Sequence, residues 1–154
     1  MNKIIHEISF DNRTRHDIDF DHEMKEIVKN FAKFFKINKQ ILLDVKVVSK
    51  RKIKLLNKEY RNKDYVTDIL SFGHYDRSLY DQLPFVLLGE LIICYDRMVE
   101  QAIEFNHSIK REFCYLFTHG LVHLAGYDHE VEEERIKMNK IVDKIFKPLK
   151  IGRE

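Results

Sequence analysis

Three histidines in the last third of the chain constrain its fold and chemistry more than any other feature. His119 and His123 are four residues apart, and His129 follows six residues later, beyond Gly126. Positions i and i+4 of a helix lie on one face, with Cβ atoms about 5–6 Å apart. Gly126 permits a left-handed turn that ends the helix and returns the chain toward the same point. Three neutral imidazoles with one open position are the donor set of a catalytic zinc site.

A structural cluster of hydrogen-bonded histidines is the alternative interpretation of the same residues. Burial of these rings without a ligand would cost desolvation free energy that nothing nearby offsets, so metal binding is favoured. The spacing also resembles that of the metzincin zinc peptidases, which carry a general-base Glu directly after the first histidine. Gly120 stands at that position here, which argues against peptide hydrolysis by that route. Asp128 is the nearest acid; it either orients an imidazole, the favoured role, or contacts water or substrate.

The length and the distribution of apolar residues indicate a single domain over residues 1–154. No apolar run approaches the roughly 18 residues of a membrane span, so we expect no membrane association. The N-terminal segment lacks the apolar stretch of a signal peptide, and Glu7 and Asp11 arrive early, which predicts a cytoplasmic protein. Cys94 and Cys114 lie in apolar segments and are expected to be small buried residues.

The net charge of +2 neither requires nor excludes a nucleic-acid partner, because a nuclease can use a local basic groove. The most one-sided run is Lys-Arg-Lys-Ile-Lys at residues 50–54. A solvated helix face is the favoured interpretation of this run, and a binding patch is the alternative.

The hydrophobic periodicity predicts an α+β fold, in which a small mixed β-sheet packs against several helices and the histidine helix is central. Asp19 or Asp21, Ser49, Asp96 and Ser108 are candidate N-caps of the first four helices. Strands are expected over residues 3–10, 41–48, 67–72 and 86–94, and helices over 21–36, 50–61, 97–105, 109–125 and 130–147.

Two further features are unusual for a compact domain. Residues 73–84 read as a long loop, which favours a position beside a functional site. Glu90 interrupts the most strand-like segment of the chain. Its side chain lies either on an exposed face of the sheet or toward a functional site, and the sequence favours neither.

Several blocks together resemble the YbeY family of bacterial endoribonucleases. The stretch 119–129, His-Gly-Leu-Val-His-Leu-Ala-Gly-Tyr-Asp-His, is similar to the histidine signature of that family. Residues 57–61 with 67–72, and residues 88–94 with 100–102, resemble two further blocks. Three departures stand out: Glu90 where the family usually has Asp, Tyr65-Val66 where it has Lys-Pro, and Gly73 where a proline is common.

The resemblance implies one Zn²⁺ ion held by His119, His123 and His129. It also implies that Arg61 stabilises the charge that develops on a phosphodiester, because a guanidinium binds phosphate oxygens in a two-pronged geometry. A salt bridge at a helix end is the structural alternative for Arg61. Asp68 and Ser71 are secondary candidates, with a structural role favoured for Asp68, and His74 is left outside the ligand set.

The implied function is zinc-dependent, single-strand-specific cleavage of RNA in small-subunit rRNA 3′-end maturation and ribosome quality control. The implied partners are single-stranded RNA or rRNA, and the ribosome or ribosomal proteins. One alternative is a metal-dependent hydrolase of another small ester or amide. The other is a non-enzymatic ribosome-assembly factor with a structural metal. The nucleophile, either zinc hydroxide or the RNA 2′-OH, and the oligomeric state stay open.

Overall fold

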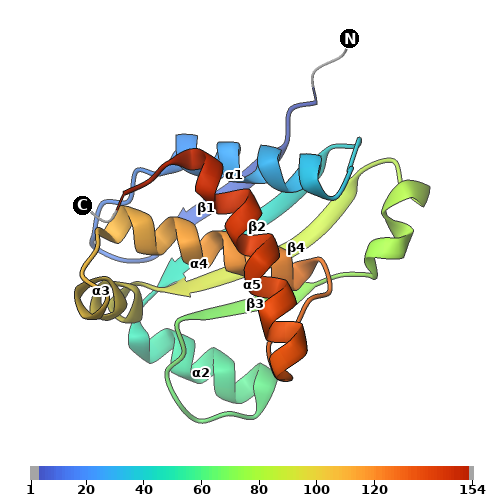
Figure 1. Ribbon diagram of the computed structural model, residues 1–154. Coiled ribbons are helices and arrows are strands. Elements are labelled where there is room, and N and C mark those ends of the chain that lie inside the picture. Colours follow the sequence, from blue (N-terminus) through green and yellow to red (C-terminus); the bar gives the residue numbers. More distant parts are fainter. Residues whose placement is uncertain (1–3, 153–154) are drawn as a thin grey trace.

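A four-stranded mixed sheet forms the centre of the structure, a computed structural model that describes residues 4–152 (Figure 1). The strand order is β1 (Glu7–Asn12), β2 (Ile41–Val48), β4 (Val86–Cys94) and β3 (Ile69–Gly73). β1, β2 and β4 are parallel, whereas β3 is antiparallel to β4 and forms an edge of the sheet. The predicted α+β class with a small mixed sheet is therefore confirmed.

The helices are distributed unequally over the two faces of this sheet (Figure 1). α1 (Asp21–Phe34), α4 (Ile109–Leu124) and α5 (Glu132–Phe146) cover one face, and α2 (Lys50–Arg61) packs on the other. α3 (Tyr95–Glu104) follows β4 directly and contacts both α2 and α4. Two short 3-10 helices, η1 (Arg77–Gln82) and η2 (Lys147–Leu149), complete the described chain.

The larger of two apolar clusters lies between the sheet and the α1, α4 and α5 layer. Phe113, Phe117 and Leu121 of α4 are fully buried there, so the histidine helix is central as predicted. The smaller cluster joins α2 to the opposite face through Ile53, Leu70 and a few neighbours. α4 is thus held by packing on several sides, while α2 depends on a small apolar contact.

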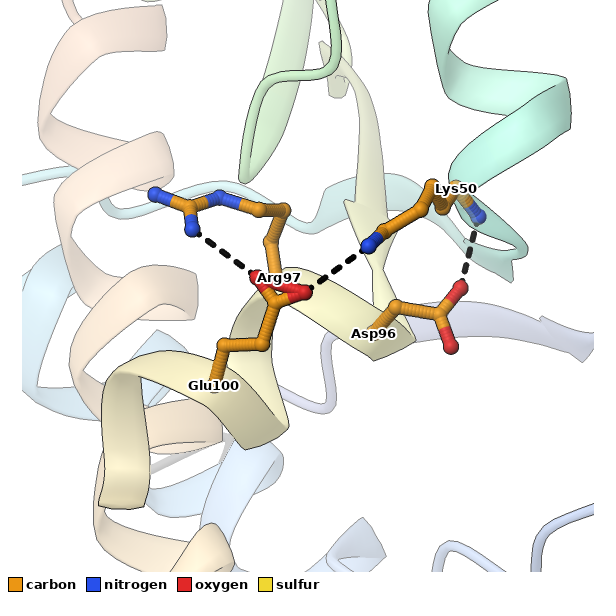
Figure 2. Close-up of polar contacts among 4 residues, drawn as sticks. All are labelled: Lys50, Asp96, Arg97 and Glu100. Carbon is orange, nitrogen blue, oxygen red and sulfur yellow. Dashed lines mark hydrogen bonds and ion pairs between the residues drawn. The ribbon is translucent and has the colours of Figure 1, made fainter. Parts of the chain in front are cut away.

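Polar contacts fix the N-terminus of α2 against α3 (Figure 2). The Ser49 side chain accepts a hydrogen bond from the Lys52 N–H, which confirms the predicted cap. The Asp96 carboxylate also accepts from the Lys50 N–H, at 2.8 Å, so it binds the start of α2 rather than its own helix. The Glu100 carboxylate bridges the Lys50 ammonium and the Arg97 guanidinium, at 2.9 and 3.0 Å.

The predicted cap at Asp96 is therefore wrong, and α3 begins at Tyr95 without a side-chain cap. α1 likewise has Phe20 at its N-cap position and no side-chain cap from either Asp19 or Asp21. The Ser108 cap of α4 is confirmed by its bond from the Arg111 N–H.

Six of the nine predicted helices and strands differ from the structure at one or both ends. α1 ends at Phe34 rather than residue 36, α3 spans Tyr95–Glu104 rather than 97–105, and α4 ends at Leu124 rather than residue 125. β1 begins at Glu7 rather than residue 3 because its partner β2 begins at Ile41, and residues 1–3 lie outside the described residues. α5 spans Glu132–Phe146 rather than 130–147, and the predicted strand at 67–72 is observed at Ile69–Gly73. The predicted loop 73–84 contains η1, whose start is capped by the Asp76 side chain.

A register shift in β4 accounts for Gly89 and for the position of Glu90. Leu42 pairs with Leu87, but Leu43 pairs with Gly89, so Leu88 is the extra residue of a bulge. Gly89 has φ +145°, and a Cβ there would lie 2.3 Å from the Phe72 carbonyl oxygen, which excludes any other residue. Beyond the bulge, Glu90 lies on the face that carries α2 and pairs with Lys46 at 3.5 Å.

No helix among residues 4–152 has the length and apolar character needed to cross a membrane.

Candidate metal centre and active site

The C-terminal end of α4 is pressed against β3 at Gly120. A Cβ at position 120 would lie 2.7 Å from Leu91 Cδ2 and 2.9 Å from Ile69 Cδ1, closer than real contacts allow. A side chain at position 120 therefore fits only if the ends of the Leu91 and Ile69 side chains shift. The two histidines that flank this turn, His119 and His123, are consequently carried close to the edge strand.

The turn after α4 brings the third histidine back to the first two. Gly126 adopts φ +106°, and its N–H donates to the His123 carbonyl at 2.9 Å. Tyr127 anchors the turn, because its ring lies 6.0 Å from Phe35 and 5.2 Å from the Arg77 guanidinium. The 73–84 segment contacts this turn through Arg77, which donates to the Tyr127 hydroxyl, but none of its residues lines the histidine cavity. His74 lies elsewhere, on the α2 face of the sheet.

The three imidazoles form a compact group. The ring centroids of His119 and His129 are 5.5 Å apart, and those of His123 and His129 are 6.3 Å apart. Two imidazoles on one tetrahedral zinc have centroids about 5 Å apart, since each Zn–N bond is about 2 Å long. The first pair is near that separation and the second exceeds it, so a shared ion requires His123 to turn inward. Accordingly, no group of three or more His, Cys, Asp or Glu within residues 4–152 has the arrangement of a preformed metal site.

The environment keeps two of these rings neutral. Burial, helped by the nearby His129 ring, lowers the pKa of His119 to about 4, although Asp68 opposes the shift. Burial also lowers the pKa of His123, while Asp128 acts in the opposite direction. A neutral imidazole has a free lone pair on one nitrogen, which is the form that binds a metal. The three imidazole nitrogens as donors, with His119 and His123 held neutral, fit zinc, which catalytic sites bind through three nitrogen ligands.

Arg61, at the C-terminal end of α2, reaches over the edge of the sheet toward the histidines. Its Nη2 donates to the Ser71 carbonyl at 2.6 Å, and its guanidinium carbon lies 5.0 Å from the centroid of the Phe72 ring. Among residues 4–152 no carboxylate lies within ion-pair distance of Arg61, so the helix-end salt bridge is not formed. The guanidinium, fixed on the Ser71 carbonyl, therefore retains N–H donors for an anion.

The two acids near the site have different contacts. The Asp128 Oδ1 accepts from the His129 N–H at 2.7 Å and so fixes the turn that presents the third histidine. The Asp68 carbonyl accepts from the Cys94 N–H at 2.8 Å, which joins the start of β3 to the end of β4. Asp68 does not hold Arg61; its carboxylate accepts a weak bond of 3.5 Å from the Thr67 hydroxyl.

One cavity of about 520 Å³ is lined by all the predicted site residues: Arg61, His119, His123, Asp128 and His129. The structure adds residues that the sequence analysis did not single out. Lys63 contributes a second cation to the wall, and its proximity to Arg61 in the chain was the available signal. Asn57 is buried and donates to the Tyr65 carbonyl at 3.0 Å, which holds the wall formed by residues 62–68.

The remaining candidates lie outside this cavity. Glu90, His74 and Lys52 line a groove on the opposite face of the sheet, beside Tyr60. In the run 50–54, Ile53 is fully buried and the charged residues are exposed, which agrees with a solvated helix face. Cys94 and Cys114 are buried free thiols, as expected.

Comparison with known proteins shows to which family the chain belongs. Residues 7–150 match the family described as Endoribonuclease YbeY. The chain belongs to the YbeY family. An Endoribonuclease YbeY from Mycoplasmopsis synoviae is 64% identical over 136 residues, which is 88% of each chain. A second, from Mycoplasma mobile, is 42% identical over 142 residues and covers 92% of this chain and 93% of its own.

A solved structure is also similar to this chain. The solution structure of a protein from Thermotoga maritima matches with a TM-score of 0.57 and 26% sequence identity, covering 93% of this chain and 91% of that one. The YbeY-like block of residues 57–61 and 67–72 meets the histidine stretch at the cavity through Asn57, Arg61 and residues 67–71. The departures at Glu90 and Gly73 lie outside its walls, whereas Tyr65 belongs to them.

Proposed function

We propose that this chain is a zinc-dependent endoribonuclease that cuts single-stranded RNA. We further propose that it acts in the cytoplasm on small-subunit rRNA precursors, in 3′-end maturation and ribosome quality control, in contact with the ribosome or ribosomal proteins. Membership of the YbeY family supports RNA cleavage. The donor chemistry of the three histidines supports the proposed zinc ion.

The observation that carries the proposal is the meeting of Arg61 with His119, His123 and His129 in one cavity. Arg61 arrives from the α2 face and the histidines from the α4 face, so the two groups converge only through the tertiary fold. Imidazole nitrogens bind zinc, and a guanidinium binds phosphate oxygens. A phosphodiester satisfies both kinds of group, whereas an uncharged ester or amide would leave Arg61 without an anionic partner.

A zinc ion held by the three imidazoles would act as a Lewis acid and lower the pKa of a bound water to about 7. The protein side chains provide the remaining functions. Arg61, fixed on the Ser71 carbonyl, binds and orients the scissile phosphate and stabilises the charge that develops on it. Asp128 holds the turn that carries His129 and helps to orient the ligand set.

The test compares variants for metal content and for cleavage of single-stranded and duplex RNA. We expect His123→Ala to lose both zinc and cleavage, and Arg61→Ala to retain zinc but lose cleavage. Arg61→Lys should restore little activity, because an ammonium lacks the two-pronged geometry. His22→Ala is the matched control, since His22 is exposed on α1 and lies outside the cavity.

Each alternative function has its own outcome in the same experiment. Zinc-bound parent protein that cleaves no RNA, while hydrolysing a small ester in a manner that depends on His123, would identify a hydrolase of another class. Zinc whose removal unfolds the chain, with no hydrolysis of any substrate, would identify a structural metal in an assembly factor. Cleavage by Arg61→Ala at the parental rate would remove the role assigned to Arg61.

A further inference from the structure

The outer edge of β3 forms part of the wall of the histidine cavity. β3 pairs only with β4, in the register Ile69 with Ile93 and Ser71 with Leu91. The Cys94 N–H bonds to the Asp68 carbonyl, one position before this run. In an antiparallel pair, residues that bond across the pair alternate with residues whose backbone groups point away.

This alternation decides which backbone groups face the cavity. Because Asp68 bonds to β4, Leu70 and Phe72 also direct their backbone groups to β4. Ile69, Ser71 and Gly73 consequently direct theirs outward. The bond from Arg61 Nη2 to the Ser71 carbonyl, at 2.6 Å, is independent evidence for this direction.

The outward side of Ser71 opens on the site rather than on bulk solvent. Ser71 and Ile69 line the same cavity as His119, His123 and Arg61. Gly120 brings the histidine turn to within contact distance of Ile69. Apart from strand pairing, the hydrogen bond that Ser71 makes within residues 4–152 is the one its carbonyl accepts from Arg61.

The N–H and the carbonyl of one strand residue point the same way. The Arg61 guanidinium, bound to the Ser71 carbonyl, therefore lies beside the Ser71 N–H, and both present donors to the cavity. A backbone N–H on a paired strand is a donor of fixed position that needs no reorganisation when charge develops nearby. A cation and a rigid amide donor side by side are suited to two oxygens of one phosphate.

We propose that the outward backbone N–H of Ser71 donates a hydrogen bond to a non-bridging oxygen of the scissile phosphodiester, beside Arg61. Ser71 is thus a catalytic residue through its backbone, and its hydroxyl is dispensable. This inference rests on the proposed RNA cleavage and adds a specific donor to it.

Proline substitution tests the N–H directly. Ser71→Pro removes it, and proline is tolerated on an edge strand where the N–H points outward. Ser71→Ala retains the N–H and removes the hydroxyl. Gly73→Pro makes the same backbone change two residues along the same edge, outside the cavity, and a Cβ at position 73 meets only Leu124 atoms at 3.8 and 3.9 Å.

We expect Ser71→Pro to lower kcat for single-stranded RNA about 10²–10³-fold, the effect of removing one preorganised donor. KM, zinc content and thermal midpoint should stay near the parental values. Gly73→Pro should cleave within a few-fold of the parent, and Ser71→Ala should lose far less activity than Ser71→Pro. Parental cleavage by Ser71→Pro would overturn the inference, as would an equal loss in Ser71→Ala, which would assign the effect to the hydroxyl.

Amide NMR of the parent protein provides a measurement that does not depend on how Ser71→Pro folds. On titration with a single-stranded 2′-O-methyl RNA, we expect the Ser71 amide proton to shift downfield and the Gly73 amide to stay unchanged. An unmoved Ser71 amide in a protein that binds and cleaves RNA refutes this inference alone. A parent protein that neither binds nor cleaves RNA refutes the proposed function instead.

Discussion

Substitution of Gly120 by alanine should separate catalytic activity from stability. The new Cβ would lie 2.7 Å from Leu91 Cδ2, and Leu91 is fully buried, so the contact cannot relax into solvent. Ordinary carbon contacts are about 3.5–4.0 Å, so α4 and the sheet must separate locally by about 1 Å. Overpacking of this kind costs about 1–3 kcal/mol, and the higher helix propensity of alanine offsets about 1 kcal/mol of it.

We therefore expect Gly120→Ala to lower the free energy of unfolding by only about 1 kcal/mol. The same displacement moves the histidine turn relative to Arg61 and β3, and a misplacement of about 1 Å can cost about 10²-fold in rate. Urea unfolding and RNA cleavage, measured on the same preparation, check the two effects together. The matched control is Gly152→Ala, because a Cβ at position 152 meets no atom within 4 Å.

A second substitution tests the cause. Ile69→Val deletes the Cδ1 atom that lies 2.9 Å from the position the new Cβ would occupy, so the double variant should recover part of both losses. This is a double-mutant cycle with an expected favourable coupling. If Gly120→Ala alone is as stable and as active as the parent, close packing of α4 on β3 does not position the histidines, and the reasoning fails.

Three further predictions concern stability. Tyr80→Phe should stabilise the fold by about 1 kcal/mol, because the buried Tyr80 hydroxyl has no hydrogen-bond partner within residues 4–152; Tyr75→Phe should destabilise it by a similar amount, since the Tyr75 hydroxyl accepts from the Leu87 N–H, and urea midpoints compare the two. The metal-free protein should lose up to about 3 kcal/mol of unfolding free energy as the pH falls from 6.5 to 4, because the unfolded chain then protonates His119 while the folded chain, with this pKa lowered to about 4, does not. A series of urea midpoints against pH in chelator should become flatter in His119→Gln, and equal slopes in the two proteins would contradict this assignment. Asn57→Ala should cost about 1–3 kcal/mol and weaken RNA cleavage by releasing the wall at residues 62–68, and cleavage unchanged at a lowered midpoint would show that this wall is not needed.

The sequence predicts those elements whose signals are local. The strands at 41–48 and 86–94 and the helix at 50–61 have the predicted ends, because alternation and the Ser49 cap act within a few residues. The cap predicted at Asp96 is wrong because its partner, the Lys50 N–H, is far away in the chain. A carboxylate in a capping position can bind either helix start, and only the tertiary fold shows which.

The candidate site shows the same division. The histidine spacing and Gly126 indicate where the three imidazoles converge, since both act through local backbone geometry. The edge position of β3, and therefore the outward direction of the Ser71 backbone, depends on pairing with β4 and has no local signal. In the sequence Gly120 marks only the absence of a catalytic Glu, but its contacts with Leu91 and Ile69 show that packing alone favours a glycine there.

The unequal covering of the sheet has a consequence for how the protein loses activity on heating. α2 is held by a small apolar cluster and by the exposed ion pairs near its N-terminus, whereas α4 lies in the large core. Segments with few buried contacts open at a lower free energy than the whole domain does. Release of α2 would remove Arg61 from the cavity while the histidine turn stays folded. Thermal inactivation should therefore precede global unfolding, because Arg61 would leave the cavity with α2 while the histidine turn could still bind a metal.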